Sequence, residues 1–394
     1  MRFWVGGWGR AQDGECEGVS QITAGDADSP LSGGALRDVG LATRAESPSW
    51  LAAHPTRDVV YAALEADGVV AAYARTGEAT LVPLGAPADA GAAVCHLAVA
   101  PGGEFLIASC WGDGRVVHLP LRADGAIDSP VIAQAAVDPY SSRTPAAALT
   151  EALAGDEPVD LSALIAGGVD PSDIAALMAG HAPRAQEEVP TPAAEPRPSR
   201  AHCAVFLPGG VVATTDLGYD LVRFWRAAPS GLAPIGQVVL PFGCGPRHLL
   251  RHPSGHLFVA TEFSGEVFVL RQAADSTWSL AGGVTESPAK LDIDTGAGIA
   301  LSPDGEVVWV GLRGSDTIAV LNVRGQGDAL RPVALVDSGV TTPRHHEVGR
   351  DALLVTGQGS HEIATLPLDA RTGIPGRVTR RLSSPSPTHL LPVR

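Results

Sequence analysis

Short apolar segments, each bounded by turn-forming residues, follow one another along most of the chain. Residues 96–121, HLAVAPGGEFLIASCWGDGRVVHLPL, contain three such segments, separated by a Pro-Gly turn and a Gly-Asp-Gly turn. The segments are rich in Val, Leu, Ala and Phe, a composition typical of β-strands. The pattern therefore predicts a unit of strand, turn, strand, turn and strand.

This unit recurs at a nearly constant spacing. The proline of its first turn lies at Pro55, Pro101, Pro208, Pro253 and Pro303. The spacing is 46 residues for the first pair, 45 from Pro208 to Pro253 and 50 from Pro253 to Pro303. Repeats of about 40–50 residues with about four strands each are typical of β-propeller blades.

The two ends of the chain supply a further blade. A sixth copy of the unit begins at His346 and lacks the turn proline. RFWVGGWG and GVSQITAG, near the N-terminus, are interpreted as two strands, and THLLPVR at the C-terminus as their missing innermost strand. Closing a ring in this way leaves no free edge between the first and last blades. We predict an all-β fold: one seven-bladed β-propeller domain over residues 1–394, closed by N- and C-terminal strands in one blade.

One interval is too long for a blade. Pro101 and Pro208 are 107 residues apart, and the excess lies in residues 138–198. Its first part has helix-like apolar spacing, with Asp160 and either Asp170 or Ser172 at N-cap positions. Its last part, EEVPTPAAEPRPS, is typical of a Pro/Ala linker. We predict a partly helical insertion between repeats, which fits a surface excursion or a lid.

Composition and charge exclude several functional classes. The 46 Gly and 32 Pro residues fit a turn-rich fold, and the net charge of −15 disfavours nucleic-acid binding. No apolar run approaches the ~20 residues of a membrane span, and Gly6 and Gly7 interrupt the N-terminal run. Five scattered cysteines without a CxxC motif argue against disulfides or zinc. We expect a cytoplasmic monomer without membrane or nucleic-acid partners.

Several motifs together resemble one known family. They are FWVGGWG, SPSWLAAHP, VCHLAVAPGGEFLIASCWGDGRV, RAHCAVFLPGG, TTDLGYDLV, GPRHLLRHPSG and ALSPDGEVVWVGLRGSDTIAV. This set resembles the seven-bladed β-propeller lactonases, the 6-phosphogluconolactonase-like family of the bacterial cytosol, which includes fungal carboxy-muconate cyclases. The resemblance covers almost the whole chain except the insertion. It implies an intracellular lactonase that needs no cofactor and takes a small-molecule lactone or carboxylate.

The resemblance also implies a site of one His, two Arg and one Glu at one mouth of the channel. The matching positions, predicted to be catalytic, are His202 in RAHC, Arg247 in GPRH, Glu262 in VATEFSG and Arg313 in VGLRGSD. Four more residues are predicted to bind substrate: Arg200, His248, His345 and His96. No metal is predicted, because the adjacent histidines at 345 and 346 lack further carboxylates at ligand spacing.

The chain departs from the family motifs around this site. Cys110 and Trp111 replace the family's Asn and Tyr, and Thr261 and Leu312 replace an Asn that precedes Glu262 and Arg313. These changes indicate an altered pocket rim. They favour a substrate other than the family's phosphorylated sugar lactone more than a change of chemistry.

The residues suggest a general-base mechanism. No GxSxG nucleophile motif is present. Glu262, flanked by His202 and tuned by burial, could accept a proton near neutral pH. Arg247 and Arg313 could stabilise an oxyanion or bind a carboxylate or phosphate.

Structural alternatives remain for the same residues. Glu262 and Arg247 could form a structural ion pair, Arg313 could be a solvated turn tip, and His202 could cap a strand. The recurrence of histidine at positions 96, 248 and 346 favours packing between blades. For the whole protein, a lactone-forming cycloisomerase acting on an unphosphorylated substrate and a non-catalytic scaffold remain alternatives. Convergence of the four predicted catalytic residues would favour an enzyme.

Overall fold

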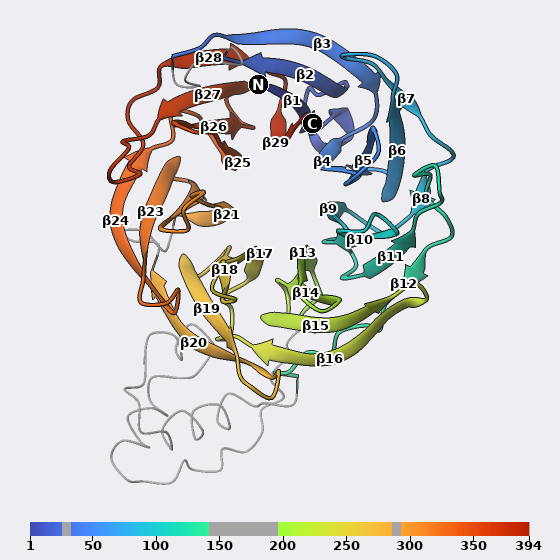
Figure 1. Ribbon diagram of the computed structural model, residues 1–394, viewed down its shortest axis with the longest axis vertical. Coiled ribbons are helices and arrows are strands. Elements are labelled where there is room, and N and C mark those ends of the chain that lie inside the picture. Colours follow the sequence, from blue (N-terminus) through green and yellow to red (C-terminus); the bar gives the residue numbers. More distant parts are fainter. Residues whose placement is uncertain (26–32, 142–195, 286–292, 394) are drawn as a thin grey trace, which may run out of the picture.

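The computed structural model describes residues 1–25, 33–141, 196–285 and 293–393. Seven antiparallel sheets form a ring, as predicted (Figure 1). Six sheets have four strands, and the seventh has a short fifth strand. The helical pieces predicted within residues 138–198 fall in 142–195, outside the described residues.

In each blade the strands run in order from the ring axis outward. The first blade has β29 (Pro387–Pro392), β1 (Arg2–Gly7), β2 (Gly18–Ala24) and β3 (Leu36–Arg44). The second has β4 (Pro48–Ala53), β5 (Val59–Leu64), β6 (Val69–Arg75) and β7 (Leu81–Pro83), with β8 (Ala88–Asp89) also paired to β6. The third has β9 (Val94–Val99), β10 (Phe105–Cys110), β11 (Val116–Pro120) and β12 (Val131–Ile132).

The remaining four blades follow the same plan. The fourth has β13 (Ala201–Leu207), β14 (Val211–Asp216), β15 (Leu221–Ala228) and β16 (Gly231–Val239). The fifth has β17 (Pro246–Arg251), β18 (Leu257–Thr261), β19 (Glu266–Gln272) and β20 (Trp278–Thr285). The sixth has β21 (Thr295–Leu301), β22 (Val307–Arg313), β23 (Thr317–Arg324) and β24 (Ala329–Asp337), and the seventh has β25 (Pro343–Val348), β26 (Ala352–Gly357), β27 (Glu362–Pro367) and β28 (Arg380–Ser383).

Strands from both chain ends close the ring, as predicted. β29 pairs antiparallel with β1, with Phe3 opposite Pro392 and Val5 opposite Leu390. The two ends of the chain therefore lie side by side in one blade (Figure 1). This pairing gives β1 a partner on its inner edge. In the other blades, that partner is the strand that directly precedes the second strand in the sequence.

The core lies between neighbouring blades. The second strands β5, β10, β14, β18 and β26 are buried along their whole length. Because such a strand is covered on both faces by adjacent blades, its sequence is nearly continuously apolar and does not alternate with polar residues. Ile107 and Leu106, neighbours on β10, thus contribute to two different apolar clusters, one on each face.

Two of the recurring histidines connect adjacent blades, as predicted. The backbone N–H of Ala204 on β13 donates to His96 Nδ1 on β9 at 3.4 Å. The imidazole of His346 on β25 lies 3.2 Å from the carbonyl oxygen of Trp309 on β22. Both contacts join innermost strands to the next or preceding blade.

Candidate active site

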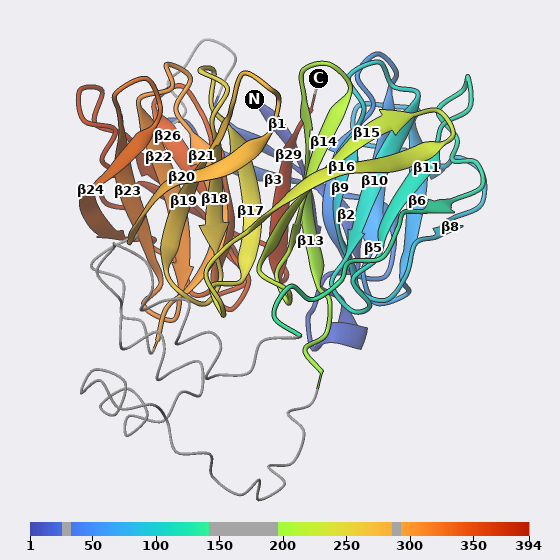
Figure 2. The same cartoon turned by 90° about the horizontal axis from the view of Figure 1, so that it is seen from below.

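One end of the ring axis carries a pocket. In each blade, the start of the innermost strand and the end of the second strand lie at the same end, because the two strands are antiparallel. The only helix among the described residues, the single-turn η1 (Arg10–Gln12), lies at this end, as does the chain leading into β13 (Figure 2). The pocket has a volume of about 280 Å³, at the lower end of ligand pockets. This size suits a molecule with a single ring.

Most innermost strands contribute the second residue from their start to this pocket, and β4 and β17 also contribute the next residue, Trp50 and His248. The residues at the second position are Ser49, Cys95, His202, Arg247, Arg344 and Thr388. A second group follows or ends the second strands: Trp8, Glu65, Trp111, Glu262 and Arg313. The pocket is therefore assembled from all seven blades, each of which supplies one to three residues.

A β-bulge lies at most of these inner positions. In β17, Pro246 pairs with Thr261 and His248 with Ala260, so Arg247 has no partner residue. β25 has the same irregularity at Arg344, and further innermost strands have it at Ser49, Cys95 and Thr388. A bulge changes the alternation of side chains and redirects one of them. Here the redirected residue lines the pocket in every case.

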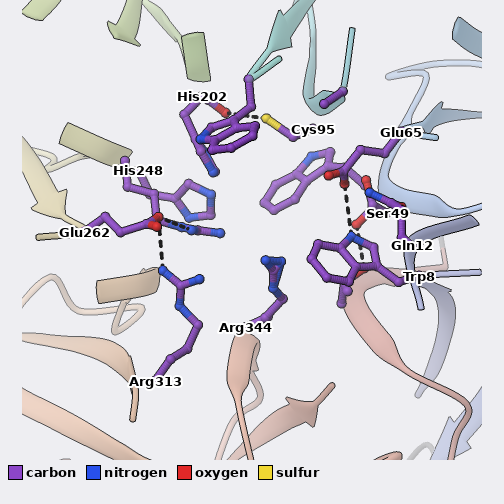
Figure 3. Close-up of a pocket in the computed structure, with 15 residues that line it drawn as sticks. Trp8, Gln12, Ser49, Glu65, Cys95, His202, His248, Glu262, Arg313 and Arg344 are labelled. Carbon is purple, nitrogen blue, oxygen red and sulfur yellow. Dashed lines mark hydrogen bonds and ion pairs between the residues drawn. The ribbon is translucent and has the colours of Figure 1, made fainter. Parts of the chain in front are cut away.

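Glu262 joins two of the predicted arginines (Figure 3). Its Oε2 lies 2.6 Å from Arg247 Nη1 and 3.0 Å from Arg313 Nη2. All three side chains are at most 17% exposed. The ion pair considered for Glu262 and Arg247 is thus present, and it forms a wall of the pocket. Arg313 is part of this wall and is not a solvated turn tip.

The ionisation of Glu262 differs from the expectation. Burial alone raises the pKa of this carboxyl, but Arg247, Arg313 and Arg344 together hold the pKa below its usual value. Glu262 is therefore a carboxylate near neutral pH, and burial does not tune it into a base that titrates there. The sequence argument considered burial and did not include the second and third guanidinium groups.

His202 is the second side chain in the pocket that could accept a proton. It is 6% exposed, and its Nδ1 is buried without a hydrogen-bond partner. Burial and then Arg247 hold its pKa well below the usual value, so the ring is neutral at pH 7. A neutral imidazole has one nitrogen free to accept a proton. The His248 ring, also in the pocket lining, is 5.2 Å from the His202 ring.

Trp50 on β4 also lines the pocket. The Trp50 indole packs against the imidazoles of four histidines, at centroid distances of 3.9 to 5.5 Å. We call these four residues the histidine ring: His96, His248, His345 and His389. The indole N–H of Trp50 donates to the carbonyl oxygen of Leu97 at 3.2 Å, which fixes the ring plane.

The four residues predicted to bind substrate lie at different positions relative to the pocket lining. His248 lines the pocket, whereas His96 and His345 pack against Trp50 outside the lining. Arg200 lies at the rim, with its guanidinium 4.0 Å from the Trp111 ring centroid. Direct substrate contacts by these four residues stay predictions.

Sequence reasoning missed Arg344, which projects between the Glu262 wall and Trp8 (Figure 3). Its guanidinium lies 4.2 Å from the Trp8 ring centroid. Burial, Arg247 and Arg313 lower its pKa to about 9. A signal for it exists in the sequence, because Pro343-Arg344-His345 repeats the Pro246-Arg247-His248 triplet at the start of an innermost strand.

Asp220 is a buried carboxylate that holds the turn preceding Arg247 through hydrogen bonds. It is 1% exposed, and its Oδ1 and Oδ2 accept the N–H groups of Gly245 and Gly243, each at 2.9 Å. Gly245 in turn accepts the N–H of Glu262 at 2.7 Å. Arg197, at the return of the insertion, donates to Asp220 at 2.6 Å and to Asp138, where the insertion begins, at 2.7 Å. Asp220 therefore links the base of the insertion to the turn that positions Arg247 and Glu262.

Asp220→Ala is expected to lower the free energy of unfolding by about 3 kcal/mol, because it removes a buried ion-pair partner and the carboxylate that accepts two backbone N–H groups. Urea unfolding would measure the loss. Asp58→Ala, on an exposed turn, is the control and should change stability by less than about 0.5 kcal/mol. Equal midpoints for the two variants would contradict this role of Asp220.

Two features do not occur in the part of the chain that the structure describes. No group of three or more His, Cys, Asp or Glu side chains is arranged to hold a metal ion. No helix within the described ranges is long and apolar enough to cross a membrane.

Comparison with known proteins extends these observations. Residues 3–147 and 168–392 match a family model described as lactonase, 7-bladed β-propeller. A 6-phosphogluconolactonase of Bacillus subtilis is 26% identical over 319 residues, which cover 79% of this chain and 76% of the relative.

Two solved structures share the fold. A Lactobacillus plantarum protein superposes with a TM-score of 0.76 at 20% identity, covering 99% of this chain and 98% of its own. A periplasmic gluconolactonase of Pseudomonas aeruginosa gives 0.71 at 20% identity, with 99% and 98% covered. These low identities show the fold alone. Because one fold relative is periplasmic, the cytoplasmic location stays a prediction.

Proposed function

Because the chain belongs to the seven-bladed β-propeller lactonase family, we propose that it hydrolyses the ring ester of a sugar-acid or related carboxylic lactone. The observation that carries the proposal is the convergence of His202, Arg247, Glu262 and Arg313 on one pocket. These residues come from β13, β17, β22 and the position directly after β18, so the fold alone brings them together. Such convergence favours an enzyme over a scaffold.

The proposed reaction begins with water attack on the lactone carbonyl. Neutral His202 accepts a proton from the water as its oxygen bonds to the carbonyl carbon. Arg247 and Arg313 donate hydrogen bonds to the oxyanion that forms. The bond from the carbonyl carbon to the ring oxygen then breaks, and the proton on His202 passes to that oxygen. The product is the open-chain hydroxy acid.

Glu262 holds the two guanidinium groups and balances part of their charge. An anionic carboxylate at this position keeps both arginines pre-oriented for the oxyanion, which lowers the reorganisation needed in the transition state. The same residues would serve the reverse, lactone-forming direction, because both directions share one transition state.

A lactone panel tests the proposal. Wild-type protein is expected to hydrolyse at least one of glucono-δ-lactone, 6-phosphoglucono-δ-lactone and glucaro-1,5-lactone faster than the spontaneous reaction, followed by acid release in a pH-stat. His202→Asn is expected to lower kcat roughly 100- to 10,000-fold, as for loss of a general base.

The matching hydroxy acids, incubated in the same way, would reveal the cyclising direction. Hydrolysis by His202→Asn at the wild-type rate would contradict the role of His202. No acceleration of any lactone in either direction would overturn the proposed function.

A further inference from the structure

We propose that Arg344 is a specificity-determining residue that binds an anionic substituent of the substrate, remote from the ester that reacts. This inference rests on the proposed function. It assigns separate tasks to arginines that line one small pocket: Arg247 and Arg313 serve the reacting carbonyl, and Arg344 serves a carboxylate or phosphate elsewhere on the lactone.

The first argument is the charge of the pocket. Its lining contains three arginines, Arg247, Arg313 and Arg344, and two carboxylates, Glu65 and Glu262. The formal charge is therefore positive, on a chain whose net charge is −15. A cationic pocket on an acidic protein attracts an anionic ligand locally, against the overall field.

The second argument is the different pairing of the three arginines. Arg247 and Arg313 share Glu262 at 2.6 and 3.0 Å. Within the described residues, no ion pair joins Arg344 to a carboxylate, whereas the buried Nε atoms of all three arginines lack a hydrogen-bond partner. A buried guanidinium is stabilised by an anion that accepts its hydrogen bonds. A ligand anion would supply this partner.

The third argument is the way Arg344 is held. Its guanidinium carbon lies over the Trp8 ring, 4.2 Å from the centroid, and the Trp8 indole N–H donates to Glu65 Oε2 at 3.2 Å. This cation–π contact restrains the guanidinium without using its N–H donors. Figure 3 shows the side chain projecting toward the middle of the pocket, between Trp8 and Glu262. The bulge in β25 produces this direction.

The fourth argument is electrostatic. Burial is the main cause that lowers the pKa of Arg344 to about 9, and repulsion from the nearby Arg247 and Arg313 adds to it. An anion bound at Arg344 would reduce this repulsion. In a pocket of about 280 Å³, an anion fixed there would also orient a single-ring lactone toward Arg247 and Arg313.

The test compares ring-matched substrates. Arg344→Met is expected to raise KM roughly 10- to 100-fold for 6-phosphoglucono-δ-lactone or glucaro-1,5-lactone, as for a lost charge-assisted hydrogen bond. KM for uncharged glucono-δ-lactone is expected to change less than about threefold. Arg344→Lys should recover part of the loss. The charged substrate with the larger effect identifies the anion as phosphate or carboxylate.

Arg122→Met is the matched control, since the Arg122 side chain is 58% exposed on the surface. It should leave all three KM values unchanged. An equal rise of KM for charged and uncharged lactones in Arg344→Met would overturn the proposal, and hydrolysis of the uncharged lactone would show that this variant is folded.

A binding measurement separates this inference from the proposed function. If wild-type protein hydrolyses no lactone, the proposed function fails, and calorimetry with 6-phosphogluconate, glucarate and gluconate still tests Arg344. The inference predicts tighter binding of the first or second than of gluconate, with the difference lost in Arg344→Met. Equal binding of all three ligands by the wild type would overturn it.

Discussion

Glu262→Gln is expected to hydrolyse lactones roughly 100- to 1,000-fold more slowly than wild type, an effect like the loss of one oxyanion donor. Glutamine has nearly the same shape but lacks the charge that holds Arg247 at 2.6 Å and Arg313 at 3.0 Å. Without that charge, these two arginines and Arg344 repel one another and no longer converge on the carbonyl. Steady-state kinetics on the preferred lactone of the panel would measure the loss.

The design must distinguish lost catalysis from lost structure. Glu104→Gln, at an exposed position in the third blade, is the control and should retain wild-type turnover. Urea unfolding of Glu262→Gln should show a cooperative transition, which establishes that the pocket rests on a folded ring. A folded Glu262→Gln protein with full activity would remove Glu262 from the mechanism.

Acidification from pH 7 to pH 5 is expected to destabilise the protein by several kcal/mol through the histidine ring. Burial lowers the pKa of His96 to about 3, and burial, His346 and His96 lower that of His345 to about 3. Burial, together with Arg247 for His248 and with His345 for His389, holds the other two well below the usual value.

The sign of this effect follows from proton binding. In the unfolded chain these histidines take up protons near pH 6.5, whereas in the folded protein they do so only at much lower pH. Between about pH 6.5 and 4, the unfolded state therefore binds more protons, and stability falls as the pH falls. Each histidine contributes on the order of 1 kcal/mol per pH unit in this range.

Urea unfolding at half-unit steps between pH 7 and pH 5 would measure this slope. His389→Gln is expected to make the slope shallower, because one of the four titrating groups is gone. His256→Gln, at a partly exposed turn outside the histidine ring, is the control and should change the slope less. Stability that does not change over this range would contradict the prediction.

The fold could be predicted from the sequence because a propeller blade is encoded locally. Each repeat carries its own strands and turns, so Pro101 and Pro253 mark equivalent hairpins without any knowledge of their neighbours. Closure by β29 was also predictable, since the terminal segments supply the strands that one blade would otherwise lack. The structure of the insertion's helical part lies outside the described residues.

The site was only partly predictable. The motifs that resemble the family identified four residues that the structure brings to one pocket. Arg344 was missed because no functional residue of the family had been matched to its position, although its triplet repeats that of Arg247. The packing of His96 and His345 against Trp50, outside the pocket lining, could not be predicted from the sequence either. Each follows the bulged residue of its strand, and a shift of one position along such a strand changes whether a side chain points into the pocket or toward Trp50.

The sequence by itself determined the repeat, the closure of the ring and the chemical types of the predicted catalytic residues. Only the tertiary structure decided which of these groups meet and what charge each carries. Glu262 and Arg344 are 82 positions apart in the chain and come from the fifth and seventh blades, yet they influence one another's pKa because the closed ring brings both into one pocket. Ionisation depends on burial and on distances between charges, and those quantities exist only once all seven blades have closed.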